Sequence, residues 1–179
     1  MKNRHFIGVF VVALLAICTL ISCGINEDEN ESENNSSKVE DLSSEYVDLG
    51  LPSETKWKTT NEYYNETYYH DFDDAVGTFG GSLPIKEQWE ELKSYCYWQL
   101  QRDGSYKVVG PNGNSIVLPA EGMRTCSGKI EDVGSFGRYW SSTPRGSEGA
   151  WYLNFDSCKI SINSYDLRCR GLSIRLVHN

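Results

Sequence analysis

The most reactive side chains in this chain are its cysteines, of which the 179-residue sequence has six. Two lie near the N-terminus, and the others are Cys96, Cys126, Cys158 and Cys169. Outside the cytoplasm an even number of cysteines indicates disulfide bonds, and four cysteines allow three pairings. We expect Cys158 to pair with Cys169, its neighbour in sequence, and Cys96 with Cys126. A buried free thiol at Cys96 is the alternative, because this residue lies on the apolar side of an expected helix.

Other patterns for catalysis or metal binding are weak. His70 and His178 are the histidines beyond the N-terminal segment, too few for a metal site and without the setting of a general base. The run from His70 to Asp74 lacks the alternating oxygen ligands and the glycine of a calcium loop, and an aspartate that caps a helix explains it better. We therefore expect no metal, no cofactor and no enzymatic activity.

Aromatic side chains are the other chemical resource, with eleven tyrosines and five tryptophans. Most of them are expected in the core, because a β-rich domain of this size needs large apolar side chains. Tyr63, Tyr64, Tyr68 and Tyr69 have polar neighbours instead, within residues 61–70. On a loop, such rings can stack on sugars or anchor a protein partner. We expect these four tyrosines to face a ligand.

The N-terminal segment has the pattern of a signal peptide over residues 1–22. Lys2 and Arg4 precede an uncharged apolar run over residues 6–21, which is short for a membrane span of about 20 residues. The run ends in Leu-Ile-Ser-Cys and resembles the bacterial lipobox, which implies cleavage before Cys23 and a lipid on its thiol. Acyl chains then anchor the protein, at about 0.8 kcal/mol per buried CH₂. An ordinary signal peptide or a transmembrane anchor is the alternative.

Residues 23–44 are expected to be the lipidated cysteine and a disordered acidic tether. The tether carries seven acidic residues, one lysine and no aromatic residue, too little apolar surface to fold. An acidic run after the lipidated cysteine resembles the surface-export signal of Bacteroides-type lipoproteins. This resemblance implies that the protein is exported to the outer face of the outer membrane. The alternative is the periplasmic face, with the acidic run acting only as a solvated spacer.

Residues 45–179 have the pattern of one α+β domain. Trp89, Leu92 and Cys96 recur at spacings of three and four and predict a main helix over residues 86–96, which Ile85 caps poorly. A short helix is expected over residues 71–76. Elsewhere the apolar period of two predicts strands, with a half-buried one at the end. These strands cover residues 46–52, 56–60, 106–109, 115–118, 119–124, 138–142, 151–156, 159–162 and 172–177.

The order of short motifs along the domain resembles the major paralogous domain family first named from Fibrobacter succinogenes, which is common among Bacteroides-type lipoproteins. The motifs lie at residues 46–53, 56–57, 73–75, 80–81, 83–84, 89–92, 110–116, 118–120, 134–135, 139–143 and 171–177. The resemblance implies a C-type-lectin-like fold related to formylglycine-generating enzymes, with a twisted, mainly antiparallel sheet, one main and one short helix and long loops. Residues 61–70 replace a longer insert of that family.

These patterns together predict a non-enzymatic, lipid-anchored cell-envelope protein that binds a glycan or a protein outside the cell. A net charge of −8 disfavours nucleic acid as a partner. A structural or assembly subunit of a surface appendage or envelope complex is the alternative. A cysteine-oxidising activity is the third hypothesis, although Cys158 and Cys169 lack the Cys-x₄-Cys spacing that such chemistry uses.

Overall fold

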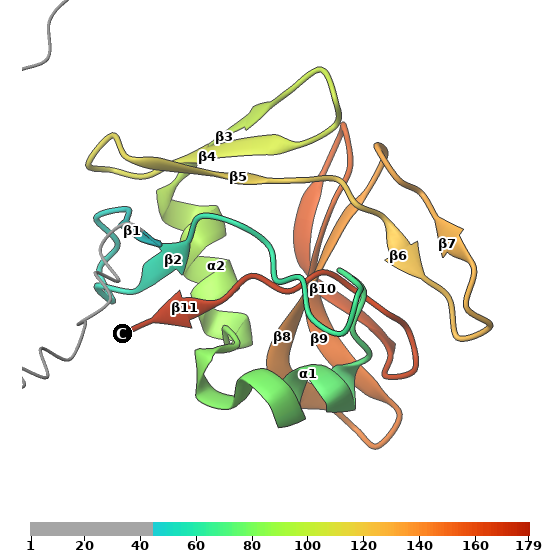
Figure 1. Cartoon of the computed structure of the whole chain (residues 1–179). Helices are drawn as coiled ribbons and strands as arrows, with labels where there is room; N and C mark the ends of the chain where they lie inside the picture. Colours follow the sequence, from blue (N-terminus) through green and yellow to red (C-terminus); the bar gives the residue numbers. More distant parts are fainter. Residues whose placement is uncertain (1–44) are drawn as a thin grey trace, which may run out of the picture. The chain divides into compact units, whose positions relative to one another are not determined.

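The computed structural model of the protein describes residues 45–179, with the exception of the side chains of residues 163 and 164. The expected signal peptide, Cys23 and the acidic tether lie outside the described residues. Within them, short antiparallel strands form three three-stranded sheets and one two-stranded ribbon, joined by two α-helices (Figure 1). Mainly antiparallel strands with two short helices confirm the predicted α+β class.

The strands pair mostly with their neighbours in sequence. The exception is the last strand, which returns to the first sheet, where Trp57 lies opposite both Val47 and Val177. The first sheet comprises β1 (Tyr46–Asp48), β2 (Lys56–Lys58) and β11 (Val177–His178), the second β3 (Tyr97–Leu100), β4 (Tyr106–Val109) and β5 (Ser115–Leu118), and the third β8 (Gly137–Arg145), β9 (Gly149–Phe155) and β10 (Ile160–Leu167). The ribbon comprises β6 (Met123–Arg124) and β7 (Ile130–Glu131).

The main helix, α2 (Lys86–Tyr95), packs against the β8–β9–β10 sheet and buries Trp89 and Leu92 completely. Its first turn has the poor cap predicted at Ile85, and another element supplies the missing oxygen. Thr143 of β8 accepts the Lys86 backbone N–H with its hydroxyl at 3.0 Å. The short helix α1 (Phe72–Phe79) has the predicted aspartate cap, because Asp71 accepts the Asp74 N–H at 2.9 Å. A 3₁₀ turn, η2 (Gly80–Ser82), separates the two helices.

The segment over residues 171–177 crosses the middle of the described domain towards β11 (Figure 1). It was expected to be a half-buried strand, and this is wrong, because all seven residues are buried. His70 flanks it through backbone hydrogen bonds to Leu172, and Tyr139 pairs with Ser173 on its other side. Leu172, Ile174 and Leu176 pack in a hydrophobic cluster, and Ser173 and Arg175 bind polar partners, so neither face of the segment is wet.

Other strand predictions also differ from the structure. Residues 119–124 were expected as one bent strand, but only Met123–Arg124 is a strand. Pro119 lacks an N–H, and Gly122 has a φ of 69°, so neither supports a regular ladder there. No strand was predicted directly after α2, where β3 begins two residues after the helix ends and places the exposed Tyr97 at its start.

Candidate functional site

The predicted cysteine pairing is wrong: Cys126 bonds to Cys169, with their Cα atoms 5.1 Å apart. The reason is a backbone pairing between Arg124 and Gly171, whose N–H and C=O groups bond each other at 2.8 Å. In an antiparallel pair, moving two residues forward from Arg124 and two back from Gly171 reaches Cys126 and Cys169. Cys158 cannot reach Cys169, because all eight residues of β10, about 26 Å of extended chain, lie between them.

The other two cysteines of the domain are free. Cys96 is half-buried at the end of α2, as the free-thiol alternative predicted, and burial, with the nearby charge of Glu91, raises the pKa of its thiol to about 11. Cys158 is exposed in the β9–β10 turn, where Asp156 accepts its backbone N–H at 2.7 Å. Because the pKa of the Cys96 thiol is raised, little of this thiol is ionised at neutral pH.

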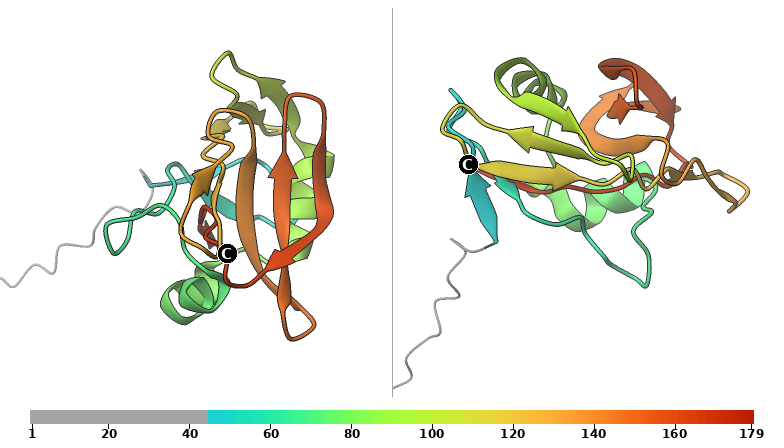
Figure 2. Two further views of the ribbon diagram at one scale, coloured as in Figure 1. Left: turned by 90° about the vertical axis from the view of Figure 1, so that its right-hand side faces the viewer. Right: turned by 90° about the horizontal axis from the view of Figure 1, so that it is seen from above.

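Residues 61–70 form a tight hairpin that projects from the rest of the described domain (Figure 2). We call it the tyrosine hairpin. Tyr64 and Thr67 exchange both backbone hydrogen bonds, at 3.1 and 3.2 Å. Asn65 and Glu66 between them have positive φ angles of 48° and 61°, which is the backbone of a type I′ turn. The hairpin is therefore a regular local structure.

Three of the four predicted ligand-facing tyrosines are exposed at the hairpin. Tyr63 is 60% exposed, and Tyr64 and Tyr68 are each 42% exposed. The rings of Tyr63 and Tyr68 contact each other with centroids 4.7 Å apart. Tyr69 is less accessible than these three, because it is half-buried and donates its hydroxyl to the backbone oxygen of Glu121 at 2.7 Å. This hydrogen bond ties the hairpin to the segment around Glu121. Burial and the Glu121 charge raise the pKa of Tyr69.

The first end of the hairpin is held by Arg175, which is completely buried. Its guanidinium donates to the backbone oxygens of Lys58, Thr59 and Val117 at 2.7–2.8 Å and to the side-chain oxygen of Asn61 at 2.6 and 3.0 Å. Burial lowers the pKa of Arg175, and the many acceptors offset part of this cost. The hairpin thus starts from a fixed residue.

Asn61 also forms hydrogen bonds with Glu121 and Tyr139 and so connects Arg175 to both. Its amide donates to the Glu121 carboxylate at 3.0 Å and to the Tyr139 hydroxyl at 3.2 Å. Glu121 also accepts the Ser173 hydroxyl at 2.9 Å, and complete burial raises the pKa of Tyr139. Arg175, Asn61, Glu121, Tyr139 and Ser173 form one polar cluster beneath the hairpin, and we call it the arginine cluster.

The second end of the hairpin rests on His70, which is buried and packs edge-on against Phe79 of α1. Its backbone oxygen accepts the indole N–H of Trp140 at 2.9 Å, and its ring nitrogen Nδ1 lies 3.4 Å from the Asp74 carboxylate. Tyr64 contacts the edge of Phe79 as well, with centroids 6.0 Å apart. Both ends of the hairpin are therefore fixed, and its exposed rings are displayed on a rigid base.

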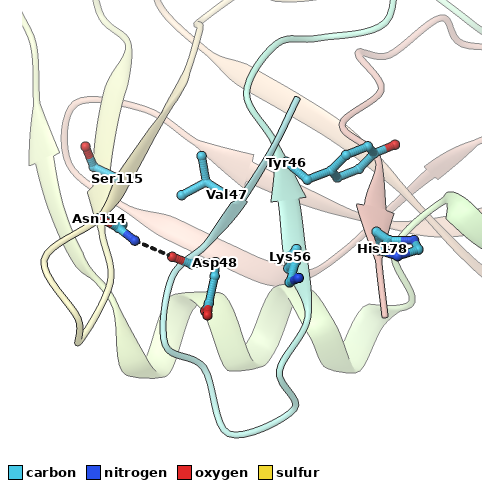
Figure 3. A pocket seen from close by; sticks show the side chains of 7 residues that line it. All are labelled: Tyr46, Val47, Asp48, Lys56, Asn114, Ser115 and His178. Atoms are coloured by element: carbon cyan, nitrogen blue, oxygen red, sulfur yellow. Dashed lines mark hydrogen bonds between the residues drawn. The ribbon is translucent and has the colours of Figure 1, made fainter. Parts of the chain in front are cut away.

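A separate hollow of about 560 Å³ lies between the first sheet and the β4–β5 turn (Figure 3). Tyr46, Lys56 and His178 line it from the three strands, with the rings of Tyr46 and His178 5.9 Å apart. Asn114 of the turn donates to the backbone oxygen of Asp48 at 2.8 Å and closes one side. Its charged side chains, Asp48 and Lys56, are both exposed to solvent.

Among residues 45–179, no group of three or more His, Cys, Asp or Glu side chains is placed to hold a metal ion. Over the same residues, no helix combines the length and the apolar character that crossing a membrane requires.

Residues 81–177 match the family described as Domain of unknown function (DUF8237). The matched stretch contains α2, the arginine cluster except for Asn61, and the β8–β9–β10 sheet, whereas the tyrosine hairpin precedes it. No curated protein and no solved structure gives a significant match. Because the matched stretch is more than half of the chain, the protein belongs to the DUF8237 family.

Proposed function

We propose that this protein is a lipid-anchored cell-envelope protein that binds a glycan or a protein outside the cell through the tyrosine hairpin. The observation that carries the proposal is the exposure of Tyr63, Tyr64 and Tyr68 on a hairpin with both ends fixed. Tyrosine joins a large apolar ring to a polar hydroxyl, which suits both sugar rings and protein surfaces. A rigid base lowers the entropy cost of binding.

Two resemblances support the cellular setting of this proposal. The lipobox that ends at Cys23 favours a lipid anchor, and the acidic run after it favours export to the outer face of the outer membrane. The motifs shared with the major paralogous domain family favour a C-type-lectin-like fold, in which loops carry the binding residues. Antiparallel sheets joined by long connections are compatible with that fold.

A binding role fits the thiols better than a cysteine-oxidising role does. Such an enzyme needs a reactive thiolate. The Cys96 thiol has a pKa of about 11, and Cys126 and Cys169 are bonded to each other. Cys158 is exposed, but no second free cysteine stands beside it among the described residues to share a redox step.

The test compares two variants of the full chain, purified in detergent, on a broad glycan array and against extracellular and envelope proteins. One variant replaces the three exposed hairpin tyrosines by serine (Y63S/Y64S/Y68S). The matched control replaces Tyr95 and Tyr97, which are 56% and 67% exposed elsewhere on the domain. We expect the hairpin variant to lose at least tenfold in affinity, about 1.4 kcal/mol or more, and the control to bind as the parent does.

The absence of any glycan or protein ligand for the parent chain would overturn the proposal. Equal losses in both variants would show that binding does not run through the hairpin. Co-purification with a filament, and loss of that filament when the gene is deleted, would instead support the structural or assembly role.

A further inference from the structure

A second cluster of aromatic and cationic side chains lies on β8, β9 and β10. The ribbons of these three strands lie side by side (Figure 2). We call Arg145, Trp151 and Tyr165 the arginine ledge. The Arg145 guanidinium carbon lies 4.6 Å from the centre of the Trp151 ring and 4.4 Å from the centre of the Tyr165 ring. Both rings therefore hold the guanidinium by cation–π contact.

The backbone around the ledge departs from regular pairing on both sides of β9. In β8 the register shifts between Trp140 and Pro144, opposite Trp151 of β9. In β10 it shifts between Ser161 and Ser164, next to the regular pair of Tyr165 and Trp151. Such bulges re-aim side chains, and they often lie beside functional sites. The ledge is therefore tied to a specific backbone irregularity.

Gly149 supplies the room that the Tyr165 ring needs. A Cβ atom at this position would lie 2.8 Å from Cδ2 of that ring, closer than such contacts occur. Tyr165 is nevertheless 56% exposed, so its ring is seated at the edge of the sheet and still open to solvent. The ring can contact a ligand and Arg145 together.

The Arg145 guanidinium has no hydrogen-bond or ion-pair partner among the described side chains. Lys86 adds a second positive charge, 4.8 Å from the Trp151 ring centre, but Glu90 already pairs with it at 2.9 Å. Arg145 therefore presents a row of free N–H donors whose position is set by the two rings. A planar fork of this kind matches a carboxylate, which accepts two parallel hydrogen bonds.

We propose that the arginine ledge binds the carboxylate of an acidic sugar in a glycan. One free arginine matches one carboxylate, and the exposed part of the Tyr165 ring offers an apolar surface to the CH groups of a sugar ring. An acidic peptide carries several carboxylates, for which the ledge has no further unpaired cation, because Glu90 already pairs with Lys86. The ledge is independent of the tyrosine hairpin and goes beyond the function proposed for it.

The experiment titrates the full chain in detergent micelles with methyl glucuronide and with methyl glucoside, which differ only in carboxylate against hydroxymethyl. The readout is the NMR signals of the Arg145 Nε–H and the Trp151 indole N–H. We expect saturable shifts with the glucuronide, at least tenfold weaker binding of the glucoside, and weaker binding of sodium acetate than of the glucuronide. The acidic peptide arm uses blocked tetraglutamate, which we expect to bind more weakly than the glucuronide.

Three variants locate the interaction. Arg145→Gln is expected to lower the affinity for the glucuronide at least tenfold. Arg145→Lys is expected to show most of that loss, because lysine keeps the charge but loses the planar fork. Arg102→Gln is the matched control, since Arg102 is exposed and has the same charge. Equal binding of glucoside and glucuronide, a loss in Arg102→Gln equal to that in Arg145→Gln, or tighter binding of tetraglutamate would each overturn the proposal. Unchanged backbone signals establish that each variant is folded.

Discussion

Arg175 is the residue whose removal tests the arginine cluster most directly. Replacing it by methionine (R175M) keeps much of the side-chain volume and removes every donor. The backbone oxygens of Lys58, Thr59 and Val117 then lose a buried partner. We expect the free energy of unfolding to fall by about 3 kcal/mol or more, measured by urea denaturation.

The control is Arg102→Met, which makes the same replacement at an exposed arginine. Its effect is expected within about 0.5 kcal/mol. If R175M were no less stable than R102M, the cluster would not hold the base of the tyrosine hairpin. Arg175→Lys is expected to fall between the two, because an ammonium keeps the charge but cannot reach acceptors on three separate segments.

The two free thiols differ in burial, and this predicts their reactivity. Burial holds the pKa of Cys96 at about 11, so about one thiol in a thousand is thiolate at pH 8. We expect iodoacetamide to modify the exposed Cys158 first and Cys96 slowly. The Cys96 rate should rise about tenfold per pH unit up to about pH 11. Peptide mass spectrometry of the labelled chain measures both sites, and Cys158→Ser should abolish the fast phase.

Side-chain patterns predicted exposure well where burial follows from local sequence, and poorly where it depends on a distant segment. Tyr63, Tyr64 and Tyr68 have polar neighbours and are exposed as expected. Tyr69 has the same neighbours, yet Glu121 draws its hydroxyl inward. Arg175 stands where alternation predicts a wet position, and its partners lie on segments more than 50 residues away. No local period contains that information.

At the scale of elements, the Cys126–Cys169 bond ties the β6–β7 turn to the end of β10. It closes a loop of 43 residues, for which chain entropy gives about 4 kcal/mol of stabilisation. We expect the double variant C126S/C169S to lose about 2–4 kcal/mol in urea denaturation. A reducing agent should destabilise the parent chain by a similar amount and leave the double variant unchanged.

Cys158→Ser is the matched control for this bond, because Cys158 is free and exposed. It should change stability by no more than about 0.5 kcal/mol. A C158S variant as destabilised as the double variant would show that Cys158 takes part in a bond that the double variant also breaks. The pairing expected from sequence would then be restored.

Elements with a strong local period could be predicted, and the contacts between elements could not. Trp89 and Leu92 fix α2 by their spacing, and both are fully buried. The hairpins β4–β5 and β9–β10 follow from period-two runs around turns. The register shifts beside Trp151 follow from no pattern in the sequence, so the arginine ledge was missed. The crossing of residues 171–177 was missed for the same reason, since it depends on which segments flank it.

At the scale of the whole molecule, the tyrosine hairpin and the arginine ledge lie on different elements of one domain. The hairpin joins β2 to α1, and the ledge lies on β8, β9 and β10. If the domain is anchored outside the cell, as proposed, one glycan chain or protein with two suitable groups is expected to use both surfaces. Two weak contacts on one chain bind more tightly together than either alone. The location of the domain decides whether such ligands can reach it.

We expect the domain to be on the outer cell surface, because the acidic run after Cys23 resembles a surface-export signal. Proteinase treatment of intact cells should then remove the domain while a periplasmic marker stays intact. The matched control replaces the acids over residues 27–33 by serine and asparagine, which should leave the lipid anchor and protect the domain from the proteinase. Protection of the parent chain would place the domain in the periplasm. The tyrosine hairpin and the arginine ledge would then meet envelope components, and the acidic run would act only as a spacer.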